Sequence, residues 1–433
     1  MFKIGDVLKN IKIISIAGGG DGIARADGIV IFVKYAASGD MLDLKITEVS
    51  KKFLRADILK INTLSSDRTS PLCEYYSKCG GCNFMHLMYD SQLEYKKNII
   101  KDALWKIAKI KEGDYFWEGI LASPHKFYYR NKLQVPVSGD KIGFYAPKSH
   151  DIINIDTCLI QSKIFTDILN KFRTLETKNF RYICMRTNHK NDILLTFVIR
   201  KTLDIPLTLL EIDNIKGILL NLNDDLKNNF VFSSASFKLV YGMPYIIEKL
   251  ADVKYKISAN SFFQINTGVG EALYEYLKLQ IKNETVLDLY CGSGGISLFI
   301  ADSAKKVIGI EVIKEAVLNA RESIKINNIK NVEFLEGTVE ENLARLKFSK
   351  SNKIDSLILN PPRKGAGDKV IDEILKIAPM KIIYVSCNPA TLARDLRMLQ
   401  EADYSIRTVR AFDMFPQTSN VETVVCLNRL KNI

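Results

Sequence analysis

Residues 286–298 read VLDLYCGSGGISL, and this stretch decides the fold. Its apolar start predicts a buried strand that ends at Asp288, and the apolar residues after the turn predict a helix. The turn between them contains three glycines, Gly292, Gly294 and Gly295. Glycine lets the backbone approach a ligand closely, and Glu311, at the end of the next predicted strand, can accept hydrogen bonds from ribose hydroxyls. The pattern predicts an adenosine cofactor without separating a dinucleotide from other adenosine cofactors.

Further strand patterns follow on both sides of this stretch. From residue 259 to 433 the chain contains VLDLY, KVIGIEV, VEFLEG, SLILN and KIIYVS, separated by segments of helix length. Strands that alternate with helices indicate a doubly wound parallel sheet. We therefore predict an α/β catalytic domain over residues 259–433.

The first half of the chain reads differently. Residues 1–59 hold short apolar runs between glycine and aspartate turns, which predicts a small β-barrel. GGGDG at 18–22 is followed by another strand rather than a helix, so it predicts a turn and not a phosphate loop. Residues 60–258 mix a cysteine cluster, a helical stretch near 89–110 and strands such as ILLTFVIR, which predicts a central α+β domain.

Charge and composition narrow the class of protein. The chain of 433 residues has 61 Lys and Arg against 49 Asp and Glu, a formal net charge of +12. This excess favours a polyanionic partner, and RNA is the leading candidate, with no DNA expected. No apolar stretch reaches the roughly 18 residues of a membrane span, and no leader segment is apparent. We therefore expect no membrane partner and a cytoplasmic location. No pattern in the sequence indicates an oligomeric state, and a monomer is the default expectation.

Cysteines are clustered in the segment PLCEYYSKCGGCNFMHL at 71–87, in a C-x5-C-x2-C pattern. Eight cysteines in a cytoplasmic chain of this size argue against a disulfide framework and for metal or catalytic use. The candidate ligands are Cys73, Cys79, Cys82 and the remote Cys158. Zinc more often shows two CxxC pairs, whereas three clustered thiols and a remote one suit an iron–sulfur cluster. Spacing alone favours iron–sulfur and leaves zinc open.

A thiol lies at the end of another predicted strand, in YVSCNPATLARD at 384–395. Asn388 and Pro389 stop that strand, which places Cys387 at the edge of the sheet where ligands bind. Asn360, in LILNPPRKG, ends a neighbouring strand at the same edge. An aspartate before the glycine turn and NPPR after a later strand resemble a class I S-adenosylmethionine (SAM) methyltransferase.

A thiol beside a methyl donor suits methylation of uracil. C5 of uracil is too weak a nucleophile to attack a sulfonium unaided, and addition of a thiolate to C6 makes C5 resemble an enolate carbon. A base must then remove the C5 proton so that the thiol can leave. AFDMFPQTSNVETVVCL near the C-terminus supplies a candidate base, Glu422, which on its own reads as an ordinary surface carboxylate.

Five segments, in the order FFQIN, DLYCGSGG, NPPRKG, YVSCNPATLARD and FPQTSNVET, resemble the RNA (uracil-C5) methyltransferase family. The N-terminal barrel resembles its TRAM domain, and the cysteine pattern resembles the 4Fe-4S site of its ribosomal-RNA branch. The resemblance implies Cys387 as nucleophile and Glu422 as proton acceptor. It implies SAM contacts from Gln264, Tyr290, Glu311 and Asn360. It also implies a 4Fe-4S cluster on Cys73, Cys79, Cys82 and Cys158.

Two positions depart from the family pattern. Many members have Asp where this chain has Asn360, and an amide gives up any ionic contact to the SAM ammonium group. Some members have Asn inside the glycine turn where this chain has Gly295, so only the backbone can contact a ligand there.

A stacked uridine cannot present C5 and C6 to the site, so the base must be flipped out of its helix. Phe263 is predicted to stack on it, with a core position as the alternative. Arg130 is predicted to contact RNA, and Arg363 either contacts RNA or braces its loop. The barrel and the excess of Lys and Arg are expected to bind RNA independently of its sequence, with an affinity that falls as the salt concentration rises.

The function predicted from the sequence is SAM-dependent methylation of uridine C5 in structured RNA, with 23S ribosomal RNA as the expected substrate. The T-loop uridine of tRNA is the alternative within the family. NPPR also resembles the NPPY loop of amino-group methylases, which need no cysteine. An iron–sulfur RNA-binding module without turnover is the non-enzymatic alternative.

Overall fold

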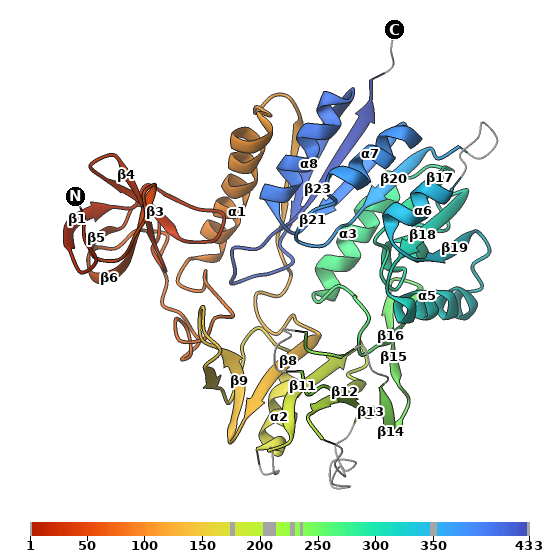
Figure 1. Cartoon of the computed structure of the whole chain (residues 1–433), viewed down its shortest axis with the longest axis horizontal. Helices are drawn as coiled ribbons and strands as arrows, with labels where there is room; N and C mark the ends of the chain where they lie inside the picture. Colours follow the sequence, from red (N-terminus) through yellow and green to blue (C-terminus); the bar gives the residue numbers. More distant parts are fainter. Residues whose placement is uncertain are drawn as a thin grey trace.

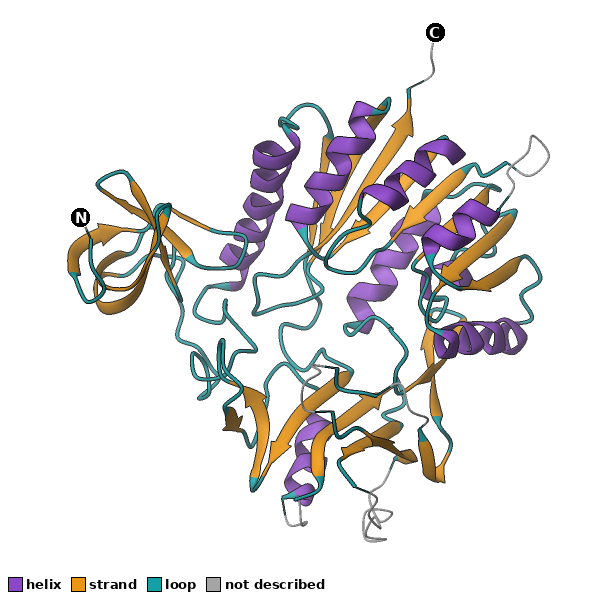
Figure 2. Ribbon diagram, viewed as in Figure 1, coloured by secondary structure: helices purple, strands orange, loops and turns teal. Residues whose placement is uncertain are grey.

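The computed structural model describes residues 2–173, 178–201, 214–225, 230–233, 237–346 and 353–430. Figure 1 shows a small N-terminal sheet at one side, a large sheet with helices on both faces, and a second sheet below them. Most of the helices surround the large sheet (Figure 2). None of the helices in the described ranges combines the length and apolar composition of a membrane span.

The N-terminal sheet curls around its own core. Its six strands, in sheet order, are β1 (Val7–Lys12), β5 (Met41–Val49), β6 (Phe53–Thr63), β4 (Ile29–Val33), β3 (Gly22–Ala26) and β2 (Ser15–Ile16). Alternate residues such as Leu42, Leu44 and Ile46 point inward and are fully buried, as period-2 strands require. GGGDG forms the turn before β3, as predicted, with a hydrogen bond from Gly20 N to Ala17 O.

The large sheet is mostly parallel and follows the predicted doubly wound pattern. Its strands, in sheet order, are β19 (Val332–Glu336), β18 (Lys306–Glu311), β17 (Thr285–Leu289), β20 (Ser356–Leu359), β21 (Lys381–Ser386), β23 (Glu422–Arg429), β22 (Tyr404–Phe412) and β7 (Phe116–Leu121). β23 is antiparallel to both β21 and β22. The central strands are buried on both faces, which explains why they read as continuous apolar runs.

Helices cover both faces of this sheet. One face is packed by α3 (Thr267–Leu279), α4 (Gly295–Phe299) and α5 (Lys314–Asn327). The other face is packed by α1 (Tyr89–Ala103), the π-helix η1 (Leu104–Ala108), α6 (Val339–Arg345), α7 (Asp368–Ile377) and α8 (Pro389–Glu401). Asn388 caps α8 by accepting a hydrogen bond from Ala390 N, and Pro389 occupies the first turn, where no backbone donor is needed.

The central sheet has seven strands and its own hydrophobic core. In sheet order they are β10 (Ile152–Asn154), β9 (Lys141–Tyr145), β8 (Lys132–Ser138), β11 (Phe180–Thr187), β12 (Ile193–Ile199), β13 (Ile215–Leu222) and β14 (Lys238–Gly242). α2 (Lys163–Phe172) packs on this sheet through Phe165, Ile168 and Phe172. A separate hairpin, β15 (Tyr245–Leu250) and β16 (Val253–Ser258), packs against α5.

The predicted domain boundaries differ from the structure in three places. β6 continues to Thr63, past the predicted end of the barrel at residue 59. α1 and β7 belong to the catalytic unit, because β7 pairs with β22 and α1 packs against α8. The hairpin of β15 and β16 also packs on the catalytic unit, ahead of the predicted boundary at residue 259. These contacts join segments far apart in sequence, which local patterns do not reveal.

Candidate active site and cysteine cavity

The glycine turn after β17 has a backbone conformation that L side chains rarely adopt. Positive φ angles occur at Tyr290 (62°), Gly292 (57°) and Gly294 (78°). A Cβ atom at Gly294 would lie 2.6 Å from Cζ of Phe334, and one at Gly295 would meet the hydroxyl of Tyr274. Packing against these two rings therefore requires glycine at both positions, in addition to any need for close approach by a ligand.

Two carboxylates hold the backbone around this turn. Glu311, at the end of β18, accepts hydrogen bonds from Gly292 N (3.0 Å) and Ile313 N (2.8 Å). Asp288 accepts one from the Ser297 hydroxyl (2.5 Å), which ties the end of β17 to α4. Burial raises the pKa of Asp288 to about 7. Both acids lie where the sequence placed them, at neighbouring strand ends.

Unpaired polar atoms near this turn fit a polar ligand. Among the described residues, Asp288 Oδ1 and Ser293 Oγ are buried without a hydrogen-bond partner. A buried polar atom without a partner costs about 1–3 kcal/mol, so a ligand that supplies donors and acceptors is favoured there. Gln264 is also buried at this site, and its side chain bonds with the hydroxyl of Tyr274. These residues fit the predicted SAM site.

Asn360 extends the site toward β20. Its backbone N donates to Leu289 O at 3.3 Å, which places it beside Tyr290 at adjacent strand ends. The residues predicted to contact SAM therefore come together around the carboxyl ends of β17, β18 and β20, with Gln264 on the loop before α3.

Strand register brings Cys387 and Glu422 together. Ser386 at the end of β21 pairs with Thr423 on the antiparallel strand β23. Cys387, which follows Ser386, therefore lies opposite Glu422, which precedes Thr423. Glu422 is buried, whereas Cys387 remains partly accessible. The predicted nucleophile and the predicted base thus lie side by side at one edge of the sheet.

Arg363 is the third charged member of this group. Burial raises the pKa of Glu422 to about 8, and the guanidinium of Arg363 acts in the opposite direction. Burial and the carboxylate of Glu422 raise the pKa of Cys387, while the charge of Arg363 and its hydrogen bond to the thiol lower it. The sequence predicts that Arg363 either contacts RNA or braces its loop. The NPPR motif does not indicate the contact between Arg363 and the thiol of Cys387.

The four cysteines of the predicted cluster line one cavity of about 420 Å³. All four are free thiols: Cys73, Cys79, Cys82 and Cys158. In the part of the chain that the structure describes, no three His, Cys, Asp or Glu side chains are arranged tightly enough to hold a metal ion. The donor set suits a four-thiolate cluster, and the cavity brings the remote Cys158 to the other three.

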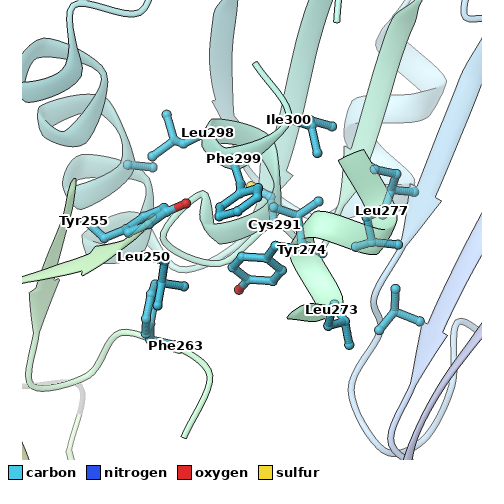
Figure 3. Close-up of a cluster of buried hydrophobic side chains, with 14 of the residues drawn as sticks. Leu250, Tyr255, Phe263, Leu273, Tyr274, Leu277, Cys291, Leu298, Phe299 and Ile300 are labelled. Atoms are coloured by element: carbon cyan, nitrogen blue, oxygen red, sulfur yellow. The ribbon is translucent and has the colours of Figure 1, made fainter. Parts of the chain in front are cut away.

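Two residues predicted to contact RNA lie near this cavity. Phe263 lines it but is only 3% exposed, and its ring packs against Tyr255 at 5.2 Å between centroids. Figure 3 shows Phe263 beside Tyr255 in the buried cluster. Phe262 is the exposed ring at this turn, at 58%. Arg130 also lines the cavity, and its Nε has no hydrogen-bond partner among the described residues.

Comparisons with known proteins identify the family to which the chain belongs. Residues 88–430 match the family model described as tRNA (uracil-5-)-methyltransferase, and residues 9–59 match the TRAM domain. An uncharacterized RNA methyltransferase of Clostridium acetobutylicum is 37% identical over 99% of this chain and 100% of its own length. One from Bacillus cereus is 36% identical over 95% of this chain and 94% of its own.

A solved structure is similar over nearly the whole chain. The tRNA (uracil-54, C5)-methyltransferase of Pyrococcus abyssi, in complex with S-adenosyl-L-homocysteine, matches with a TM-score of 0.76 and 28% identity, covering 97% of this chain and 100% of its own. The N-terminal sheet is therefore a TRAM domain, as the sequence predicted. By fold, sequence and site, the chain belongs to the uracil-5 RNA methyltransferase family and is an RNA methyltransferase that uses SAM.

Proposed function

We propose that the chain methylates C5 of a uridine in structured RNA by covalent catalysis through Cys387. The observation that carries this proposal is the grouping of Cys387, Glu422 and Arg363 at the sheet edge that also bears the SAM turn. A nucleophile, a base and a cation within reach of one another are the groups that the reaction needs.

Each side chain has a defined step. The thiolate of Cys387 adds to C6 of uracil, which forms an S–C6 bond and moves the electron pair of the double bond toward C5 and O4. SAM, when bound, supplies the methyl group that C5 takes up. Glu422 then accepts the proton from C5, and the electron pair of that C–H bond restores the C5–C6 double bond as the S–C6 bond breaks.

Arg363 favours the charged form of both partners. Its hydrogen bond and charge stabilise the thiolate of Cys387 against burial and against the neighbouring carboxylate. The same charge opposes the effect of burial on Glu422, which must be ionised to accept a proton. Arg363 is itself exposed to solvent, so water screens part of this effect in the free protein.

The target base must leave its stack to reach Cys387. We assign the stacking contact to the exposed ring of Phe262 in place of the buried Phe263. A base that stacks on an aromatic side chain gains about 1–3 kcal/mol. Arg130, which is partly exposed and lines the cysteine cavity, is the proposed contact to a phosphate or base nearby.

We assign a 4Fe-4S cluster to Cys73, Cys79, Cys82 and Cys158, because these four thiols share one cavity. Such a cluster would tie the loop that carries the first three cysteines to the segment that carries Cys158. Methylation requires no electron transfer, so this role is structural. Protein purified without oxygen is expected to contain about four irons per chain; stoichiometric zinc would contradict the assignment.

We propose 23S ribosomal RNA as the substrate, on the resemblance of the cysteine pattern to the ribosomal branch. A tRNA T-loop uridine is the second candidate, because the similar enzyme of Pyrococcus abyssi acts on tRNA uracil-54. Both RNAs present a uridine in a folded context, so the chemistry at Cys387 is the same for either.

The test is incubation of the enzyme with methyl-labelled SAM and a mixture of unmodified rRNA and tRNA, followed by separation of the RNAs and nucleoside analysis. We expect label in 5-methyluridine of the rRNA fraction, and no label with Cys387→Ala. Label in the tRNA fraction would select the second substrate. Label in an amino-methylated base, with Cys387→Ala still active, would overturn the proposed chemistry.

A further inference from the structure

The loop between β22 and β23, residues 413–421, leads directly into Glu422 and is held by the cysteine-bearing segment. Asn83 Oδ1 accepts a hydrogen bond from Ser419 N (2.9 Å), and its Nδ2 donates to Ser419 Oγ (3.0 Å). The backbone N atoms of Asn83 and Phe84 both lie within hydrogen-bond distance of Gln417 O, at 3.2 and 3.0 Å. Asn83 follows Cys82 in the chain.

The N-terminal barrel also contacts the side chain of Asn83. Asn83 Nδ2 also donates to Gly19 O at 2.9 Å, in the turn before β3. A Cβ atom at Gly20 would collide with Nδ2 of Asn83 and lie 3.1 Å from Cβ of Ser419. Glycine at position 20 of this turn is therefore required to leave room for the bond between Asn83 and Ser419.

Nucleophile and base depend differently on this loop. Cys387 follows β21 and is fixed by the cap of α8, whereas Glu422 is the first residue of β23, three residues after Ser419. Glu422 is also held by its pairing with Phe412 on β22, but it is the residue next to the loop, so a displaced loop would disturb its carboxylate more than the thiol of Cys387. In the proposed reaction, Cys387 acts at the first step and Glu422 only at the last.

We propose that Asn83 is a positioning residue that fixes Glu422 for proton removal, and that Gly20 permits this by leaving space for the Asn83 side chain. The inference rests on the proposed function. Loss of the contact is expected to slow release of the methylated base from Cys387 without slowing attack on it. A displacement of 1 Å can cost up to about 100-fold in rate, so a measurable effect on release is expected from one lost anchor.

The chain offers matched controls for both positions. Asn327 makes the same kind of contact elsewhere: its Oδ1 accepts from Lys254 N (2.9 Å) and its Nδ2 donates to Lys254 O (2.7 Å) and Ser323 O (2.7 Å). Gly28 lies in another barrel turn with a similar positive φ (78° against 90° at Gly20), but a Cβ there would meet nothing within 4 Å. Asn327→Ala thus removes comparable hydrogen bonds away from the loop. Gly28→Ala introduces the same side chain at a similar positive φ without the steric clash.

The experiment follows the covalent RNA–protein adduct with ordinary uridine RNA and SAM. Wild type, Asn83→Ala, Gly20→Ala, the two controls and Glu422→Gln are quenched in denaturant, and both the adduct and free 5-methyluridine are measured. We expect Asn83→Ala and Gly20→Ala to accumulate adduct as Glu422→Gln does, with product release slowed by about tenfold or more. RNA containing 5-fluorouridine should form the adduct at wild-type rate in these two variants.

Other outcomes are equally informative. The positioning role would be overturned if the Asn83→Ala variant released product as fast as Asn327→Ala. It would also be overturned if Asn83→Ala released product slowly without accumulating the adduct. Gly20→Ala that behaves like Gly28→Ala would remove the steric part of the inference. If Glu422→Gln itself accumulates no adduct, or wild type makes no 5-methyluridine, the proposed function fails instead, and the two failures are distinguished within one experiment.

Discussion

At the scale of single residues, the ionisation of two side chains controls the rate of methylation. Burial raises the pKa of Glu422 to about 8 and also raises the pKa of Cys387, and both groups act in their deprotonated forms. We therefore expect the rate of 5-methyluridine formation to rise with pH from about 6 to beyond 8, by up to about tenfold per pH unit for each of the two groups that is still protonated. The measurement is the pH profile of 5-methyluridine formation at constant ionic strength.

Arg363 sets the position of this profile, because its charge lowers the pKa of both groups. Arg363→Gln should shift the rise to higher pH and reduce the rate at pH 7, whereas Asn327→Ala should leave the profile unchanged. A profile that is highest at pH 6, or one that Arg363→Gln does not move, would contradict the assigned roles.

Sequence motifs predicted Cys387 and Glu422 as the catalytic residues but not the side chains that surround them. Cys387 and Glu422 could be paired before the fold was known, because each ends or begins a strand in a recognisable motif. Phe262 and Phe263 could not be told apart, since the segment between β16 and α3 has no regular period that would decide which ring points outward. Local sequence does not report which neighbour covers a side chain.

At the scale of elements, α1 and the 413–421 loop are joined by a fully buried ion pair. Lys96 Nζ lies 2.5 Å from Oδ1 of Asp413, both side chains have 0% exposure, and Tyr89 donates to the second carboxylate oxygen at 2.8 Å. Lys96→Met should lower the free energy of unfolding by about 3–5 kcal/mol, because it leaves Asp413 charged, buried and without its cation. Urea unfolding of the holoprotein measures this.

Replacing both partners tests the cause of that loss. Lys96→Met combined with Asp413→Leu removes both buried charges and should recover most of the stability. The adjacent Lys97 pairs with Glu94 at the surface, so Lys97→Met should cost less than about 1 kcal/mol. If Lys96→Met costs no more than Lys97→Met, the buried pair does not hold α1 to the loop.

Elements with a strong local period were predictable, and those completed by distant partners were not. The alternating pattern correctly gave the parallel strands from β17 to β21 and a helix near 89–110. FWEGIL, which is the whole of β7, has a weak pattern and becomes a strand by pairing with β22, almost 300 residues later. Tertiary pairing of this kind overrides local propensity.

For the whole molecule, the charge of +12 predicts how RNA binding depends on salt. Lys51 and Lys52 are exposed in the turn between β5 and β6 of the TRAM domain. Changing both to Glu should weaken RNA binding and reduce the slope of log affinity against log salt by about 2 or more. Filter binding at several salt concentrations measures the slope.

Two exposed lysines on the catalytic unit, away from the TRAM domain, provide the control for this prediction. Lys282 and Lys330 are exposed just before β17 and β19, at the amino ends of strands whose carboxyl ends form the site. Lys282→Glu with Lys330→Glu changes the net charge equally and should leave the slope close to that of wild type. Equal weakening by the two double variants would mean that net charge, and not the TRAM domain, governs the contact.

The pairing of β7 with β22 has a consequence for how such a protein diversifies. The chain enters the catalytic sheet at β7, leaves it after Leu121 and returns only at β17, so the central sheet is inserted within the catalytic unit. Inserted units can lengthen, shrink or be exchanged as long as their two ends stay in place. We expect descendants of this architecture to acquire new RNA targets mainly by remodelling the insertion, while the strands that carry Cys387 and Glu422 stay in register.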